Sequence, residues 1–256
     1  MVTTPPPLQG QVAIVTGSGR GIGRAVAQGL AAAGAAVVVT ARTPSEVEAT
    51  ADVITAAGGR AVGVVADVGR VDDLARLVAA TVDAFGGLDL VVANAGVLAP
   101  RAPVVALDEA DWQASIAVNV DSVRHLVRLA LPHLRARGGG RVLVMGSGVA
   151  RRPGPGLGAY AVSKAAASML VRVLALELRA DRIAVNEIVP GPVRTAMAEQ
   201  LGAGADPGAA GDLAASFPKG EWLKTPDDVV PLVLFCAQLP CDGPTGQTFS
   251  LLGRDP

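Results

Sequence analysis

The sequence contains few of the residues on which metal sites, disulfide frameworks and histidine-centred hydrolases depend. Its 256 residues include two cysteines and two histidines, and aromatic residues make up only 3%. Cys236 and Cys241 have no histidine near them, whereas a structural zinc site or a disulfide framework needs more ligands or partners. His125 and His133 lie in one arginine-rich segment that is typical of a solvated helix. We therefore expect free thiols, no metal site and a chemistry that does not depend on histidine.

A strong net charge and a long apolar segment are also absent from the sequence. The formal net charge of -1 gives no electrostatic footprint for nucleic acid or for an anionic membrane. The longest apolar run, residues 30–39, has roughly half the length of a membrane span. The first ten residues show no basic region followed by an apolar one, so we expect no signal peptide and a cytoplasmic location. Their three prolines predict a loose leader over residues 1–9.

Short apolar runs alternate along the chain with longer helical patterns. Near-continuous apolar strands are typical of a parallel sheet whose two faces are both covered by helices. The alternation predicts an α/β fold, a doubly wound Rossmann-type parallel sheet of about seven strands, in one domain over residues 1–256. The predicted strands are residues 11–16, 36–41, 60–65, 88–93, 141–145, 183–189 and 248–252, and the predicted helices are residues 21–33, 45–57, 71–85, 108–137 and 158–180. The irregular stretch over residues 190–226 predicts a substrate lid.

A glycine-rich turn joins the first predicted strand to the first predicted helix. It reads TGSGRGIG, residues 16–23. In such a turn the glycines let the backbone approach a pyrophosphate, and the helix N-terminus favours its negative charge. The spacing differs from the common G-x-G-x-x-G pattern, but the position after the first strand of an α/β repeat favours a dinucleotide site.

The only tyrosine in the chain lies close to one of its three lysines. Tyr160 precedes Lys164 by four residues in the stretch GLGAYAVSKAA. Residues four apart share one face of a helix, and a predicted helix covers both positions. A nearby cation favours the phenolate and lowers the phenol pKa from its usual value of about 10. We therefore predict that Lys164 tunes Tyr160, which would donate or accept a substrate proton.

These motifs follow one another in an order that resembles the single-domain short-chain dehydrogenases/reductases over nearly the whole chain. TGSGRGIG resembles the TGxxxGxG cofactor motif of that family, and YAVSK matches YxxxK. ANAG, residues 93–96, is similar to the family's NNAG, with Ala93 in place of the first asparagine. The ending TGQTFSLLGRDP departs from the common one. Within the family, the chain looks similar to 3-oxoacyl-carrier-protein reductases and carbonyl reductases.

The resemblance implies roles for individual residues. Tyr160 would be the acid/base, Ser147 would hydrogen-bond the reacting oxygen, and Asn119 would hold a water that relays protons to Lys164. Thr195 fits a helix N-cap as well as a cofactor contact. The implied cofactor contacts are Gly17, Gly19, Arg20, Gly21, Ile22, Gly23, Arg42, Asp67, Val68, Asn94, Ala95, Gly96, Tyr160, Lys164, Pro190, Gly191, Val193 and Thr195.

The end of the second predicted strand bears on the choice of nicotinamide cofactor. Ala41 stands where NAD-using relatives commonly carry an aspartate that hydrogen-bonds the ribose and repels a 2′-phosphate. Arg42 follows it, and Arg20 in the glycine-rich turn supplies a second cation. Because the arginine fork suits phosphate, we expect NADP(H) to be preferred over NAD(H). The alternative is that both arginines are merely solvated.

The implied function is an NADP(H)-dependent oxidoreductase that transfers a hydride between the nicotinamide and a carbonyl or secondary alcohol. A catalytically silent nucleotide-sensing protein on the same fold and an NAD-dependent alcohol dehydrogenase are the alternatives. The resemblance also implies a homotetramer or homodimer. Four arginines of the fourth predicted helix either form a solvated face or dock an acidic carrier protein, and they are Arg124, Arg128, Arg135 and Arg137.

Overall fold

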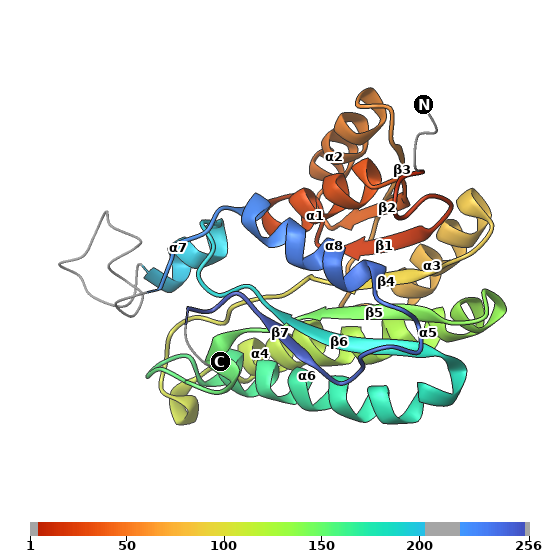
Figure 1. Ribbon diagram of the computed structural model, residues 1–256. Coiled ribbons are helices and arrows are strands. Elements are labelled where there is room, and N and C mark those ends of the chain that lie inside the picture. Colours follow the sequence, from red (N-terminus) through yellow and green to blue (C-terminus); the bar gives the residue numbers. More distant parts are fainter. Residues whose placement is uncertain (1–4, 203–220, 254–256) are drawn as a thin grey trace.

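The computed structural model describes residues 5–202 and 221–253. They form a parallel sheet of seven strands with helices packed around it (Figure 1). The leader residues 1–4 and residues 203–220 of the expected lid lie outside the described residues. The strands lie in the order β3-β2-β1-β4-β5-β6-β7. They are β1 (Val12–Thr16), β2 (Ala36–Ala41), β3 (Arg60–Val65), β4 (Leu90–Ala93), β5 (Gly140–Met145), β6 (Ile183–Val189) and β7 (Thr248–Ser250). Strand order reverses between β1 and β4, and in such sheets the ligand crevice opens at that point, at the carboxyl ends of the strands.

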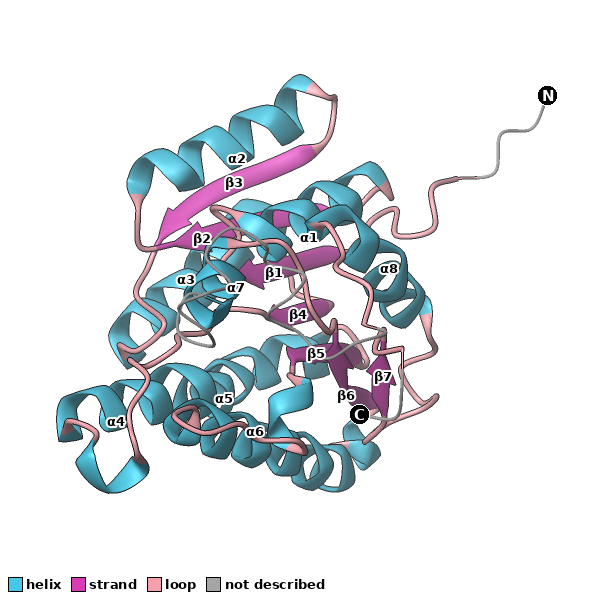
Figure 2. Ribbon diagram, turned by 90° about the vertical axis from the view of Figure 1, so that its left-hand side faces the viewer, coloured by secondary structure: helices cyan, strands magenta, loops and turns pink. Residues whose placement is uncertain are grey.

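Helices cover both faces of the sheet (Figure 2). One face packs against α1 (Gly21–Ala32), α2 (Pro44–Ala56) and α8 (Val230–Gln238). The other face packs against α3 (Val71–Phe85), α5 (Ser122–Ala136) and α6 (Gly158–Glu177). Two shorter helices are α4 (Glu109–Ile116) and α7 (Ala196–Gly202). The doubly wound α/β fold is therefore confirmed.

The strand sequences explain why both faces are covered. Ala13 and Val15 of β1 pack with α1 and α8, whereas Ile14 between them packs with the opposite helix layer, and all three are fully buried. A buried valine or isoleucine side chain contributes roughly 1.5–3 kcal/mol through removal of apolar surface from water. β3, at the edge of the sheet, alternates between exposed and partly buried positions instead.

The fourth predicted helix differs from the structure. The sequence predicts one helix over residues 108–137, whereas α4 and α5 are joined by a π-helical turn, Ala117–Asp121. This turn contains Asn119, whose buried side chain bonds to other parts of the chain. π turns of this kind are frequent at functional sites.

Helix α8 was not among the predicted helices. Its sequence, VPLVLFCAQ, is apolar almost all round and shows little of the amphipathic period by which a surface helix is recognised. It starts with Pro231 in its first turn, where a missing N–H costs nothing. Cys236 of this helix is a buried free cysteine, and burial raises the pKa of its thiol to about 11.

The leader is held at Leu8 to the end of helix α1 and to the core. This side chain is fully buried in the core, and its backbone N–H donates to the Ala33 carbonyl at 2.9 Å. The sequence predicts a loose leader over residues 1–9, and the structure differs from this near Leu8. The Leu8 side chain packs in the core together with residues of α1.

Among the described helices, α6 alone has the length and hydropathy that a membrane span requires. Half of its apolar window is buried inside the molecule, and the core helices of soluble proteins commonly pass the same test. Because α6 packs on β6 and carries Tyr160 and Lys164 on its buried side, its apolar character has an explanation within the fold.

Candidate active site

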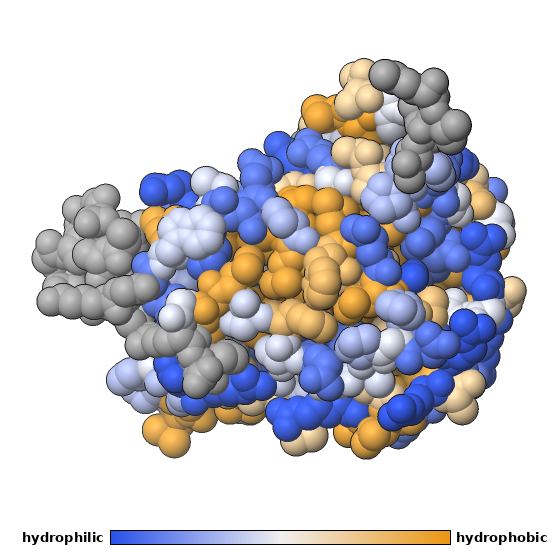
Figure 3. Space-filling view, viewed as in Figure 1, coloured by the Kyte–Doolittle hydropathy of each residue, from blue (hydrophilic) through white to orange (hydrophobic). Residues whose placement is uncertain are grey.

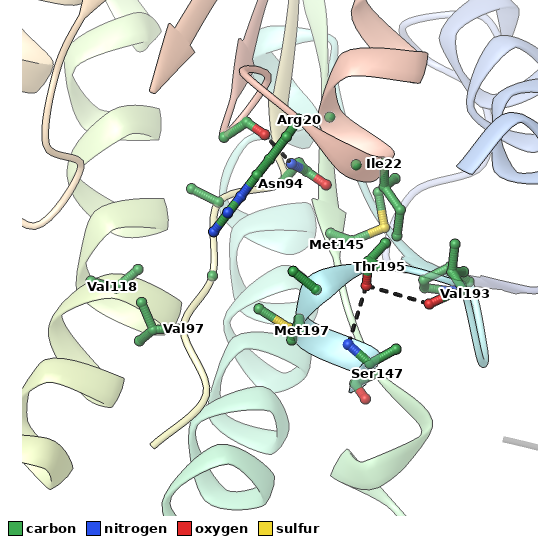
Figure 4. A pocket seen from close by; sticks show the side chains of 18 of the residues that line it. Arg20, Ile22, Asn94, Val97, Val118, Met145, Ser147, Val193, Thr195 and Met197 are labelled. Carbon is green, nitrogen blue, oxygen red and sulfur yellow. Dashed lines mark hydrogen bonds between the residues drawn. The ribbon is translucent and has the colours of Figure 1, made fainter. Parts of the chain in front are cut away.

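A cavity of about 790 Å³ opens at the carboxyl ends of the central strands. Its side chains converge from the turn before α1, the loops after β4 and β5, and the segment that leads into α7 (Figure 4). Every predicted cofactor contact lines this cavity, together with Ser147, Tyr160 and Lys164. Asn119 is the predicted catalytic residue that does not line it.

Two glycines of the glycine-rich turn, Gly17 and Gly23, lie so close to other backbone that a side chain would not fit there. Gly17 has a φ of +64°, which favours glycine, and a Cβ atom there would lie 2.9 Å from the Ala95 Cα. A Cβ atom at Gly23 would collide with the Gly17 carbonyl oxygen. The turn therefore leaves bare backbone facing the cavity, as a bound phosphate requires.

The N-terminus of α1 is open to an anion. Arg20 occupies the N-cap position with an extended backbone, and its side chain makes no capping hydrogen bond. Every residue of this helix is described, and its first turn contains no acidic residue. Its free N–H groups and helix dipole therefore favour a negative charge at the place where the glycine-rich turn faces the cavity.

Thr16 and Asn94 tie the carboxyl ends of β1 and β4 together. The Thr16 hydroxyl accepts hydrogen bonds from the backbone N–H groups of Asn94 and Ala95, both at 3.0 Å. In return, Asn94 Nδ2 donates to the carbonyls of Thr16 at 2.8 Å and Gly17 at 3.2 Å. Asn94 therefore supports the turn from behind as well as lining the cavity.

Three charged side chains line the far end of the cavity: Arg20, Arg42 and Glu46. Sequence reasoning identified the two arginines but missed Glu46, which lies in the first turn of α2. Arg20 Nη1 lies 3.9 Å from Glu46 Oε1, and 70% of the Arg20 side chain is exposed. An acidic group thus lies beside Arg20, although Ala41 stands where NAD-using relatives commonly carry an aspartate.

The loop after β3 is fixed by Asp67. Its carboxylate accepts a hydrogen bond from the Gly69 N–H at 2.9 Å, and its own N–H donates to Asp73 Oδ2 at 2.9 Å. The bond from the Asp67 backbone lowers the pKa of Asp73. Asp67 and Val68 both line the cavity, as the sequence predicted.

Tyr160 and Lys164 lie on the buried face of α6. Their exposed fractions are 6% and 5%, and Lys164 Nζ lies 5.9 Å from the centre of the Tyr160 ring. Lys164 Nζ donates a hydrogen bond to the Met145 carbonyl at 2.8 Å, at the end of β5. The Tyr160 hydroxyl lies 4.0 Å from Met197 Sδ. The segment after β6 therefore covers the tyrosine that the sequence singled out.

The pKa of Tyr160 is shifted in the direction opposite to the predicted one. Burial raises it, and a hydrogen bond with Ser147 opposes this effect only in part. Burial also lowers the pKa of Lys164 to about 8, against an opposing effect of the Glu187 carboxylate. The ammonium of Lys164 is thus the cation near the phenol, while burial keeps the phenol protonated at neutral pH.

Asn119 links the π turn to its surroundings. Its Oδ1 accepts from the Val97 N–H at 2.9 Å, and its Nδ2 donates to the Val97 carbonyl at 3.0 Å and to Ser163 Oγ at 2.9 Å. Because both ends of the amide bond to protein groups, the side chain positions the loop after β4 against α6. The water relay that the resemblance implied stays a prediction.

The segment after β6 closes the cavity on its last side. The Thr195 hydroxyl accepts from the Ala198 N–H at 3.2 Å, so Thr195 caps α7 and also lines the cavity. Asn186 bonds to Pro244 at 2.8 Å and Gln247 at 3.0 Å and fixes the chain before β7. Cavity-lining residues that sequence reasoning did not place among the cofactor contacts include Arg152, Arg194, Met197, Glu199, Glu221 and Leu252.

Two of the four arginines considered for carrier docking are engaged within the protein. Arg135 binds Asp181 through two hydrogen bonds of 2.8 Å, and Arg137 binds Asp89 at 2.8 Å. A structural role for this pair is therefore favoured over carrier recognition. Arg124 lies 3.8 Å from Asp121 of the same helical segment.

Comparison with known proteins gives one consistent family. Residues 11–206 match the family described as short chain dehydrogenase. Dehydrogenase/reductase SDR family member 4 of Bos taurus is 34% identical over 247 residues, covering 96% of this chain and 88% of that protein. The NADPH-dependent aldehyde reductase-like protein of Arabidopsis thaliana chloroplasts is 37% identical, covering 92% of this chain and 91% of that protein. A crystal structure assigned to an NAD(P)-dependent gluconate 5-dehydrogenase of Beutenbergia cavernae, with NADP at low occupancy, superposes with a TM-score of 0.86 at 36% identity, covering 98% of each chain.

Proposed function

The chain belongs to the short-chain dehydrogenase family of NAD(P)-dependent oxidoreductases, and from this premise we propose that it reduces a ketone or aldehyde with NADPH as the hydride donor. The observation that carries the proposal is the buried pair Tyr160 and Lys164 beside Ser147, in the cavity that the glycine-rich turn also lines. The proposed acid Tyr160 and the cation Lys164 therefore lie at one end of the cavity. The glycine-rich turn, which suits an anion, lies at the other end.

The residues present fit a dinucleotide. The uncapped N-terminus of α1 and the glycine-rich turn suit a pyrophosphate, and the loop after β3 with Asp67 would receive the adenine. Arg20 and Arg42 would bind a 2′-phosphate, and the segment after β6 would contact the nicotinamide. When bound, the nicotinamide supplies the hydride.

The protein's own task is to manage the proton and the carbonyl oxygen. Because burial keeps Tyr160 protonated, its hydroxyl is ready to donate to an oxygen that gains negative charge. The Ser147 hydroxyl lines the same cavity and lowers the pKa of Tyr160, and it would donate to the same oxygen. The Lys164 ammonium stabilises the negative charge that the phenol acquires after it has lost its proton.

Turnover is the direct test. Oxidation of NADPH and of NADH would be followed over ketones, aldehydes, 3-oxoacyl thioesters and 5-ketogluconate, the last because of the gluconate dehydrogenase relative. We expect turnover with NADPH, and a loss of at least about a hundredfold in kcat for Tyr160→Phe with NADPH binding retained. Binding of NADPH without turnover of any carbonyl would favour a nucleotide-sensing protein instead.

Two apolar surfaces support an oligomer. Along α6, Val162, Met169, Val173 and Leu176 are between 41% and 77% exposed. A second apolar surface lies over α8 (Figure 3), where Phe235 is 53% exposed and stacks edge-on against Phe249. Since monomers rarely expose such surfaces, we propose a homodimer or homotetramer. The cytoplasmic location expected from the sequence stays a separate proposal. Light scattering would test this, with Leu176→Glu expected to lower the mass and Arg128→Ala expected not to.

A further inference from the structure

Glu187 is a buried carboxylate in the middle of a buried strand. It is 3% exposed, and its neighbours in β6, IAVNEIV, are apolar except for Asn186. Its Oε2 accepts hydrogen bonds from Ser168 Oγ at 2.9 Å and from Thr248 Oγ1 at 2.8 Å. A buried carboxylate is costly unless it is hydrogen-bonded and near a cation, so its presence here calls for a physical reason.

The carboxylate packs against the turn that follows β5. A Cβ atom at Gly146 would collide with Glu187 Oε1 and would lie 2.7 Å from Glu187 Cδ. Gly146 joins Met145, whose carbonyl accepts the hydrogen bond from Lys164, to Ser147. Glu187 therefore lies directly behind the backbone that holds both the lysine and the serine of the proposed site.

The same carboxylate acts on the charge of Lys164. Burial lowers the pKa of Lys164, and the negative charge of Glu187 on β6 raises it. On its own helix, Lys164 has Tyr160 as a titratable neighbour one turn away. Beyond Glu187, the charged side chain of Arg151 donates from Nη2 to Thr248 Oγ1 at 3.2 Å.

We propose that Glu187 is a positioning residue that keeps the buried ammonium of Lys164 charged and holds the Met145–Ser147 turn in place beneath it. Its catalytic consequence rests on the proposed function, whereas its effect on the Lys164 charge does not. The carboxylate acts through Lys164 and the turn, from behind the cavity wall, since it does not line the cavity itself.

The charge of Lys164 is directly measurable because the chain contains only three lysines. The full-length protein would be labelled with carbon-13 at lysine Cε, and Lys164→Arg would assign the Lys164 signal. We expect this signal to titrate near pH 8 in the wild type and at lower pH in Glu187→Gln. Ser168→Ala, which removes a hydrogen bond but not the charge, should keep the midpoint near that of the wild type. Equal midpoints in the wild type and folded Glu187→Gln would overturn the proposal.

Two further measurements separate an electrostatic role from a merely structural one. In Glu187→Gln, the alkaline limb of kcat/KM for carbonyl reduction should move to lower pH by the same amount as the Lys164 midpoint. Glu187→Asp keeps the charge, one methylene further away, and should give an intermediate midpoint even where Glu187→Gln does not fold. If the wild type turns over no carbonyl, the lysine titration still decides whether Glu187 acts on Lys164. A Lys164 midpoint in Glu187→Asp equal to that of the wild type would refute the assignment. An unshifted limb in Glu187→Gln beside a shifted Lys164 midpoint would refute the catalytic consequence alone.

Discussion

Lys164 Nζ donates to the Met145 carbonyl at 2.8 Å and lies 5.9 Å from the ring centre of Tyr160, so one ammonium group connects the end of β5 to the only tyrosine of the chain. Both side chains are buried, yet burial acts on them in opposite ways. It holds the phenol neutral and makes the ammonium easier to deprotonate. The lysine is therefore the first member of the pair to lose its proton as the pH rises.

This order predicts the pH dependence of carbonyl reduction. With a Lys164 pKa of about 8, kcat/KM should decline above about pH 8, before Tyr160 ionises. Lys164→Arg should retain less activity, because the guanidinium differs in shape, but its decline should begin at higher pH. Initial rates in overlapping buffers at saturating NADPH would check both statements. A wild-type profile that stays flat beyond pH 10 would show that the charge of Lys164 does not limit the reaction.

The same pKa predicts how stability depends on pH. The folded-state pKa of Lys164, about 8, lies below its ordinary 10.5, so between these values the unfolded chain binds more protons than the folded one. The free energy of unfolding therefore gains a contribution that rises from pH 8 to pH 10.5. Lys164→Met removes it, and at about 1.36 kcal/mol per pH unit the wild type should gain about 3 kcal/mol over the variant across that window. Urea denaturation at the two ends of the window measures this change, and a constant difference between the proteins would contradict it.

The charged residues at the far end of the cavity predict cofactor selectivity. Arg42→Ala should weaken NADPH binding about tenfold and leave NADH binding almost unchanged, since only NADPH carries the 2′-phosphate. Glu46→Gln should act in the opposite direction, because it frees Arg20 from its acidic neighbour. Fluorescence titration with both cofactors measures this ratio, and Arg128→Ala, on the distant helix α5, is the matched control. Equal losses for NADH and NADPH in Arg42→Ala would mean that the arginine serves the fold rather than the phosphate.

Much of this molecule could be predicted from local patterns in the sequence. The strands at residues 36–41, 60–65 and 183–189 agree with β2, β3 and β6. Strands buried on both faces, such as β2 and β6, are recognisable as continuous apolar runs. The edge strand β3 is mostly apolar too, although none of its residues is buried. Every predicted cofactor contact lines one cavity, since the carboxyl ends of parallel strands meet at one edge of the sheet.

What the sequence did not indicate depends on contacts between distant segments. The π turn at Asn119 is stabilised by bonds to Val97 and Ser163, and no local pattern encodes these. Glu46 lies near Arg20 because α2 begins beside the glycine-rich turn. Likewise, no local pattern indicated a role for Glu187 in its apolar strand. Its role depends on contacts with Ser168, Thr248 and the turn at Gly146, which are distant in the sequence.

The link between β1 and β4 gives a last prediction. One hydroxyl, that of Thr16, accepts hydrogen bonds from two backbone N–H groups at the end of β4. Thr16→Val is similar in shape and removes the acceptor of the Ala95 N–H, whereas the Asn94 N–H keeps the Val92 carbonyl at 3.1 Å. Thr16 is 3% exposed, and an unsatisfied buried donor costs about 1–3 kcal/mol, so the free energy of unfolding should fall by about that amount.

Binding should suffer as well as stability, because the same hydroxyl sets the distance between the glycine-rich turn and the loop that follows β4. We expect NADPH affinity to fall in Thr16→Val and to return in Thr16→Ser, which restores the hydroxyl and loses only a methyl group. Urea denaturation and NADPH titration of both variants measure the two effects. Should Thr16→Val be less stable yet bind NADPH as the wild type does, the link would support the fold alone, and the turn would hold its shape through Asn94 Nδ2 and its two carbonyl partners.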